Sequence, residues 1–254
     1  MNKTIKNIIL RVSMLLGLVA FIVLVVIAKF NRDETTIKKI VIDIDEWSGN
    51  SFITKTQVLA LIDEKFDMVG KNLSGKDLEE IEKSITIIPQ VKKSDAYTDD
   101  KGNLNIKIEQ REPLFRVFNL QNQSYYVDKN GLKFPTSSNY TAKVPIITGN
   151  ILEVCDTSKK IQSPELKRLF NVIQNINKNK LWSAMIGQYN INDKKQIELI
   201  PRFGDCTIIF GDDKEIEQKL KRLDIFYFDV LKKIGWNQYK VINIMYKNQV
   251  VCLK

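Results

Sequence analysis

A run of 17 uncharged residues, Val12–Ala28, lies eleven residues from the N-terminus and constrains this chain more than any other feature. Twelve of the 17 are Val, Ile, Leu or Phe, which favours membrane insertion by about 4 to 7 kcal/mol. With the preceding apolar turn the run is long enough to cross a bilayer, and Arg11 at its edge can reach the headgroups. We predict a cytoplasmic tail over residues 1–11, a transmembrane helix over 12–30, and exported domains beyond it.

A cleaved signal peptide is the alternative interpretation of this run. The run is longer than a usual signal-peptide core, and no A-x-A cleavage site follows Ala28. Lys3, Lys6 and Arg11 flank one end, against Lys29 and Arg32 at the other. The charges alone do not fix the orientation, but so short a tail favours a cytoplasmic N-terminus.

The rest of the composition excludes several classes of protein. The formal net charge of +9 is spread along the chain, which does not indicate nucleic-acid binding. Lysines are concentrated over residues 158–180. We interpret them as a solvated helix face, and a surface attracted to anionic membranes is the alternative. Cys155, Cys206 and Cys252 lie too far apart for a zinc motif. Cys206 and Cys252 fit buried apolar positions, with one disulfide between them as the alternative.

The first exported domain, residues 36–112, is predicted to have the order β-α-α-β-β. Ile40, Ile42 and Ile44 recur with the period of a strand. Two helices follow, opened by Thr54 and Ser74 as capping residues, and the second ends near Pro89. Two further strands are expected at 91–97 and 104–108, joined by a turn at 99–103.

The second domain, residues 113–254, is predicted as a mixed α/β domain dominated by an antiparallel sheet, which makes the fold class α+β. Ser163-Pro164 opens one helix, and Asp212 with Glu215 opens a longer one that Gly235 closes. The expected strands are 115–118, 124–127, 144–147, 186–191, 196–200, 206–210, 239–245 and 249–253.

Catalytic chemistry finds little support in this sequence. The chain contains no histidine, which removes Ser-His and Cys-His pairs and the commonest metal ligand. No S-x-x-K motif occurs, and residues 70–77 resemble a phosphate-binding loop but end in Asp77 and follow a helix. A pair of carboxylates acting as a glycosidase remains open. We therefore expect no enzyme, no cofactor, no metal site and no small-molecule substrate.

Several short stretches in order resemble the FtsQ/DivIB family of bacterial cell-division proteins, and the β-α-α-β-β module resembles a POTRA domain. They are Pro89-Gln90-Val91, Glu109-Gln110-Arg111-Glu112-Pro113, Tyr125-Tyr126-Val127-Asp128-Lys129-Asn130-Gly131, Val144-Pro145 with Gly149, and the stretch from Ile244 to Val251. The chain departs from the family's pattern at Met245, where a basic residue is usual, and over 151–185.

The resemblance implies a bitopic scaffold of the divisome that binds small coiled-coil proteins of the FtsB and FtsL type and links them to septal peptidoglycan synthesis. An exposed sheet edge can accept a strand from another chain. The partner-binding residues expected at the last strand are Tyr246, Lys247, Gln249, Val250 and Val251. A secondary site is expected at Pro89, Gln90 and Val91, and a domain junction at Arg111 and Pro113.

The expected location is the bacterial cytoplasmic (inner) membrane at the division septum, with a single span and the bulk of the chain outside the cytoplasm. Two alternatives fit a POTRA module after a membrane anchor. One is a component of envelope assembly or secretion, and the other is an extracytoplasmic sensor. The first predicts several such modules or a membrane barrel, and the second predicts a cytoplasmic output domain.

Overall fold

The structure is a computed structural model that describes residues 3–32, 36–46, 51–66, 70, 72–157 and 159–254. The chain divides into two compact units. The first comprises Met1–Glu46 with Ile53–Gln110, and the second comprises Trp47–Phe52 with Arg111–Lys254. Each unit is described by itself.

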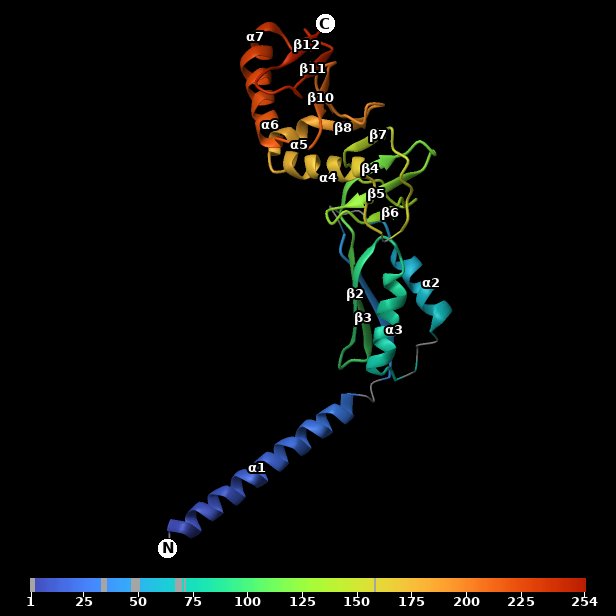
Figure 1. Ribbon diagram of the computed structural model, residues 1–254. Coiled ribbons are helices and arrows are strands. Elements are labelled where there is room, and N and C mark those ends of the chain that lie inside the picture. The colour runs from blue at the N-terminus through green and yellow to red at the C-terminus, as the bar shows by residue number, and fades with distance from the viewer. Residues whose placement is uncertain (1–2, 33–35, 47–50, 67–69, 71, 158) are drawn as a thin grey trace. The chain divides into compact units, whose positions relative to one another are not determined.

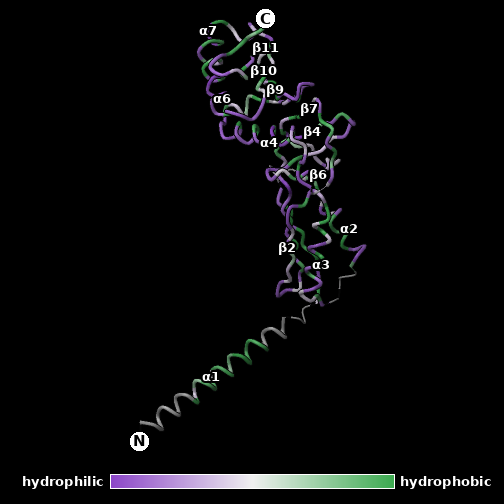
Figure 2. The backbone as a smooth tube through the Cα atoms, in the orientation of Figure 1, coloured by the Kyte–Doolittle hydropathy of each residue, from purple (hydrophilic) through white to green (hydrophobic). Residues whose placement is uncertain are grey.

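One helix, α1 (Lys3–Arg32), contains the whole apolar run. Its side chains are described over residues 12–26, all of them exposed, and Figure 2 shows this stretch as largely hydrophobic. Among the helices whose side chains are described, none is at once long and apolar enough to cross a membrane.

The remainder of the first unit has the predicted order of elements (Figure 1). They are β1 (Lys39–Ile44), α2 (Lys55–Lys65), α3 (Gly75–Thr86), β2 (Val91–Thr98) and β3 (Asn103–Gln110). The sheet order is β1-β3-β2, with β1 parallel and β2 antiparallel to β3. Its core consists of aliphatic side chains from the strands and both helices, among them Ile42, Val58, Ile62, Ile81, Ile85 and Ile106.

Both predicted helix starts are confirmed. Thr54 and Ser74 each accept a hydrogen bond from the backbone N–H three residues later, and Gln57 and Asp77 return a bond to the capping residue's own N–H. These reciprocal bonds satisfy two amides that a helix start otherwise leaves without partners.

The second unit holds one nine-stranded sheet in the order β12-β11-β10-β9-β8-β7-β4-β5-β6. Five of its eight strand pairs are antiparallel and three are parallel. The strands are β4 (Pro113–Phe118), β5 (Ser124–Asp128), β6 (Lys133–Pro135), β7 (Ile146–Gly149), β8 (Ile186–Ile191), β9 (Ile197–Pro201), β10 (Thr207–Gly211), β11 (Val241–Asn243) and β12 (Val251–Leu253). The unit is therefore rich in sheet and mixed in class.

Helices cover one face of this sheet. They are α4 (Pro164–Ile176), α5 (Lys180–Met185), α6 (Ile216–Ile225), a π-helical segment η1 (Phe226–Leu231) and α7 (Lys232–Ile234). Trp182 and Tyr227 pack edge to face within the main core, at 5.2 Å between ring centroids. Tyr125 joins this core, whereas the adjacent Tyr126 packs with Phe52 and Phe134, so the two tyrosines lie on opposite faces of the sheet.

The expected start of the long helix at Asp212 is wrong. The helix begins at Ile216, and Glu215 adopts a left-handed φ of 50° without a side-chain capping bond. The Asp212 carboxylate accepts instead from the Lys214 amide and from the buried Lys219 ammonium, at 2.6 Å. A turn held by this ion pair replaces the expected cap.

The cap of α3 yields a prediction. Ser74→Ala removes the side-chain half of the capping box and should lower the free energy of unfolding by about 0.5–2 kcal/mol. The Ser74 hydroxyl and backbone hold the pKa of Asp77 below its ordinary value, so losing the hydroxyl should raise that pKa. Urea unfolding and a carboxyl titration by NMR measure the two effects, and Ser84→Ala in the same helix is the control. Equal effects of the two substitutions would contradict the role of Ser74.

Candidate partner-binding edge

The two edges of the nine-stranded sheet differ in what covers them. At one edge, the Lys133 amide of β6 donates to the Lys159 carbonyl at 3.0 Å, and the Ile161 amide donates to Gly131 at 2.9 Å. Leu132 and Lys160 form an additional antiparallel bridge. The segment before α4 therefore pairs with the backbone around β6 and occupies this edge.

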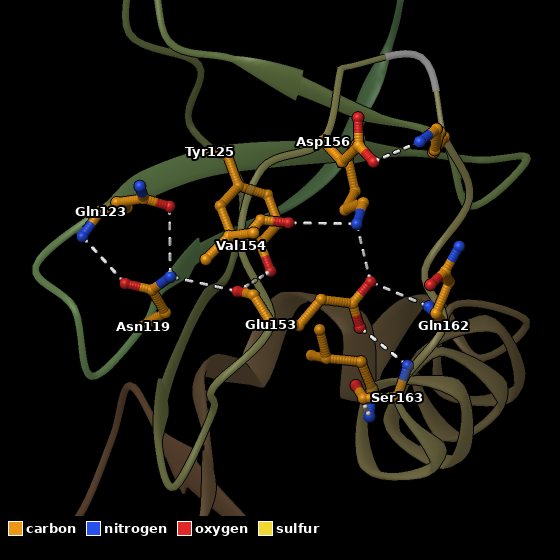
Figure 3. A network of polar contacts seen from close by, with 11 residues as sticks. Asn119, Gln123, Tyr125, Glu153, Val154, Asp156, Gln162 and Ser163 are labelled. Carbon is orange, nitrogen blue, oxygen red and sulfur yellow. Dashed lines mark hydrogen bonds and ion pairs between the residues drawn. The ribbon is translucent and has the colours of Figure 1, made fainter.

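A buried ion pair fixes that covering segment, as Figure 3 shows around Glu153. The Lys133 Nζ donates to Glu153 Oε1 at 2.8 Å and to the Val154 carbonyl at 3.0 Å. The Glu153 carboxylate also accepts from the amides of Gln162 and Ser163, at 2.8 and 2.9 Å. The two charged side chains are only 4% and 7% exposed, so each depends on the other for its charge compensation.

The protonation of Glu153 follows from these contacts. Burial raises the pKa of this carboxyl, but the hydrogen bonds from Lys133, Ser163 and Gln162 outweigh burial and bring the pKa below its ordinary value. The carboxylate is the form that the site stabilises, and the backbone carbonyl of the same residue accepts from Tyr125 and Asn119.

The opposite edge is formed by β12, which pairs antiparallel with β11. In the part of the chain that the structure describes, no strand pairs with the other side of β12. Val251 and Leu253 on this strand are 40% and 59% exposed, and Tyr246 before it is 48% exposed. An unpaired strand edge with exposed apolar side chains is a template for strand addition.

Three contacts position the chain that leads into β12. Ile242 and Ile244 are fully buried, and Arg222 of α6 donates to the Ile244 carbonyl at 3.1 Å. Met245 packs so closely over Gly211 that a Cβ there would lie 2.5 Å from the Met245 Cγ. The end of β11 is thereby held against the turn between β10 and α6.

The last strand is shorter than predicted. The expected strand over 249–253 is observed only as Val251–Leu253, and the strand expected over 239–245 only as Val241–Asn243. Asn248 has a left-handed φ of 59°, which a continuous ladder does not accommodate. Tyr246 and Lys247 therefore lie in a turn, and Gln249 and Val250 form its exit.

The predicted partner-binding residues lie together around this edge but present different chemistry. Tyr246, Lys247, Gln249 and Val251 are exposed, whereas Val250 packs partly against the core. Lys247 lies 4.0 Å from Glu215, an exposed pair that contributes little to stability. Leu253, which the sequence analysis did not select, is the most exposed apolar side chain of the edge, and its carbonyl accepts from the Lys240 amide at 2.9 Å.

Charge is distributed unevenly around β12. Residues 230–254 contain five lysines and no Asp or Glu. Lys240 and Lys254 lie near the end of β12, and Lys247 lies in the turn before it. This signal is present in the sequence, and it could have identified the last segment as a basic candidate surface.

The predicted secondary site also lies at a sheet edge, in the first unit. Pro89 and Gln90 form a turn after α3, and Val91 begins β2, the edge strand of the three-stranded sheet. The Val91 side chain is fully buried, so it serves the core and not a surface.

The predicted junction residues, Arg111 and Pro113, belong to the second unit. Arg111 lies 3.3 Å from Asp128, with both side chains almost buried, and Pro113 begins β4. Asp128 also accepts from the amides of Asn130 and Leu132, which closes the turn between β5 and β6. The Arg111–Asp128 pair therefore holds the chain just before β4 against the turn between β5 and β6.

The residues that the structure describes form a β-α-α-β-β module and a mixed sheet domain whose edge strand β12 pairs with β11 alone. The model of a POTRA-like domain matches residues 35–109, and the model described as FtsQ/DivIB, C-terminal related, matches residues 112–253. The chain belongs to the FtsQ/DivIB family, whose members are division-site membrane proteins and non-enzymatic scaffolds. No curated protein matches the sequence.

The buried ion pair yields a prediction. Glu153→Gln leaves the Lys133 ammonium buried without a counter-charge and should lower the free energy of unfolding by about 3–5 kcal/mol. Because the folded pKa of Glu153 is lowered, its contribution is present above the ordinary carboxyl pKa and is lost as the pH falls through the folded value. Urea unfolding of the two proteins at several pH values tests both effects.

Glu112→Gln is the matched control, since Glu112 forms an exposed ion pair with Lys129. This substitution should cost less than about 1 kcal/mol. If both substitutions lowered the free energy of unfolding equally, the Lys133–Glu153 ion pair would not be what holds the segment that covers β6.

Gly211 yields a second prediction for this part of the molecule. Its φ of +85° and its contact with Met245 both disfavour a side chain, so Gly211→Ala should cost about 1–3 kcal/mol. Met245→Ala in the same chain should relieve the contact but not the strain of φ, which predicts partial rescue in a double-mutant cycle. Gly75→Ala is the control, because nothing lies within 4 Å of a Cβ there. If the effects of the two substitutions on the free energy of unfolding simply added, the close contact between Gly211 and Met245 would be contradicted.

Proposed function

We propose that this chain is a single-span cell-division scaffold that binds FtsB- or FtsL-like coiled-coil proteins by adding one of their strands to β12. The observation that carries the proposal is the contrast between the edges of one sheet. The chain itself pairs with β6, whereas none of the described strands pairs with the outer side of β12. Family membership supplies the cell-division context.

The surroundings of β12 define the segment that fits. The exposed Val251 and Leu253 favour a partner strand with apolar residues at matching positions. The lysines at both ends of β12 favour acidic residues at the ends of that strand. Ladder hydrogen bonds then supply affinity, and the side chains supply selectivity.

The membrane attachment is proposed on the apolar run and the helix that contains it. The described side chains of α1 are apolar around the whole circumference and exposed, for example Leu15, Phe21 and Leu24 at 66%, 66% and 64%. A helix that is apolar on every side requires an apolar environment. We assign the tail to the cytoplasm and the two units to the other side, at the division septum.

A pull-down from membranes of the native host tests the partner site. The full chain should recover two small single-span coiled-coil proteins, and a chain without residues 249–254 should lose them. Recovery by both chains would place the site elsewhere, and recovery by neither would reject the cell-division scaffold.

Charge reversal gives a milder test that keeps the strand. Lys247→Glu with Lys254→Glu should weaken partner binding roughly tenfold at low salt, and added salt should reduce the difference. Lys143→Glu with Lys194→Glu changes the net charge equally at exposed positions elsewhere in the second unit. Binding of partner to the full chain in detergent, measured by calorimetry, compares the variants. If both pairs of substitutions weakened partner binding equally, the effect would come from the net charge and not from the lysines beside β12.

A further inference from the structure

Arg116 of β4 lies on the face of the nine-stranded sheet opposite the helices. Its neighbours in the strand, Phe115 and Val117, are fully buried in the core to which α4 and α6 contribute. Because successive side chains of a strand alternate between the two faces of a sheet, Arg116 points the other way. On that face it is in register with Tyr126 of β5 and with Ile146 of β7.

Two aromatic rings and one hydrogen bond hold the guanidinium group of Arg116 in place. Its Cζ lies 4.8 Å from the centroid of the Phe118 ring and 5.6 Å from that of the Tyr126 ring. Its Nε donates to the Ser124 hydroxyl at 2.7 Å. A guanidinium that is stacked and bonded in this way loses little conformational freedom when it binds a ligand.

The charge of Arg116 has no counter-charge within ion-pair distance among the residues that the structure describes. In the same part of the chain, Nε is the one nitrogen of the guanidinium that donates a hydrogen bond, so both Nη nitrogens remain available. The side chain is partly buried, and water therefore compensates its charge only in part. Two adjacent N–H donors of an arginine fit the two oxygens of a carboxylate or a phosphate.

The apolar side chains beside Arg116 favour a carboxylate that belongs to a protein. Phe118 and Ile146 are each 39% exposed, and they lie two positions along β4 and on the neighbouring strand. A phosphate ion has no apolar surface to cover them, whereas an acidic residue of a protein segment has side chains on either side. Arginine and aromatic side chains are also the residues that most often dominate the binding energy of protein interfaces.

We infer that Arg116, Phe118 and Ile146 form a second interaction surface, which binds an acidic side chain flanked by apolar residues on a partner protein. The carboxylate accepts from the Nη nitrogens of Arg116, and the flanking side chains cover Phe118 and Ile146. Strands β4 and β7 lie between β5 and β8 and not at an edge of the sheet, so the contact is made by side chains and needs no added strand. The inference goes beyond the proposed function and does not depend on β12.

The experiment uses the full chain in a neutral detergent, labelled with ¹⁵N-arginine and ¹⁵N-phenylalanine. The Nε–H signal of Arg116 and the backbone amide of Phe118 report binding at this surface, and spectra of Arg116→Lys and Phe118→Leu assign them. The chain has seven arginines, which keeps the side-chain spectrum simple. The probe is the capped peptide alanine-leucine-glutamate-leucine-alanine. Two comparison peptides replace its glutamate by glutamine, or both of its leucines by glycine.

The probe peptide should shift both signals and bind about tenfold more tightly than either comparison peptide, because each lacks one half of the contact. Arg116→Lys keeps the charge but loses the planar pair of donors, so it should bind the probe about tenfold more weakly. Arg202→Lys is the matched control, since Arg202 is an exposed arginine of the same unit, and it should bind like the parent. Melting temperatures within a few degrees of the parent establish that both variants are folded.

Three results would overturn the inference. Equally tight binding of the glutamine peptide would mean that Arg116 does not receive a carboxylate. Equally tight binding of the glycine peptide would mean a site for anions alone and no surface for a protein segment. Equal weakening of probe binding by Arg116→Lys and Arg202→Lys would mean that the stacked arginine has no special role. The two peptide comparisons use the unsubstituted chain, so they decide the question even if Arg116→Lys does not fold.

Discussion

The ion pair between Lys133 and Glu153 decides which edge of the nine-stranded sheet remains available. Both charges are buried, so the covering segment cannot leave β6 without exposing or orphaning one of them. An open sheet must manage two edges, and this chain covers one with its own backbone. Within the described part of the second unit, β12 is therefore the edge that the proposed strand addition would use.

The elements that local chemistry specifies were predictable from the sequence. Thr54, Ser74 and Ser163 each cap a helix within three residues of their own position, and Gly235 ends the last helix with φ of +102°. The alternating isoleucines of β1 and β3 predicted the strands of the first unit in the same way. Each of these signals acts over a few residues, so no knowledge of the tertiary structure is needed.

The features that decide the candidate site depend on contacts between distant residues. Glu153 reaches Lys133 across 20 positions, and this pair has no sequence pattern. The segment 151–185, which resembles the family least, supplies Glu153 and the cover of β6. Its composition alone indicated only a basic helix. The length of the last strand was overestimated because the apolar residues of β12 extend back to Val250. The left-handed φ of Asn248 interrupts the ladder just before this point.

The two edges of the nine-stranded sheet present different costs to an incoming strand. At β6 the strand would have to displace a backbone segment held by a buried ion pair. At β12 no strand of the described chain has to leave. Since each ladder bond contributes only about 1 kcal/mol net, a buried ion pair outweighs several such bonds. The same backbone chemistry therefore gives one closed and one available edge in the described sheet, and the side chains over each edge set the difference.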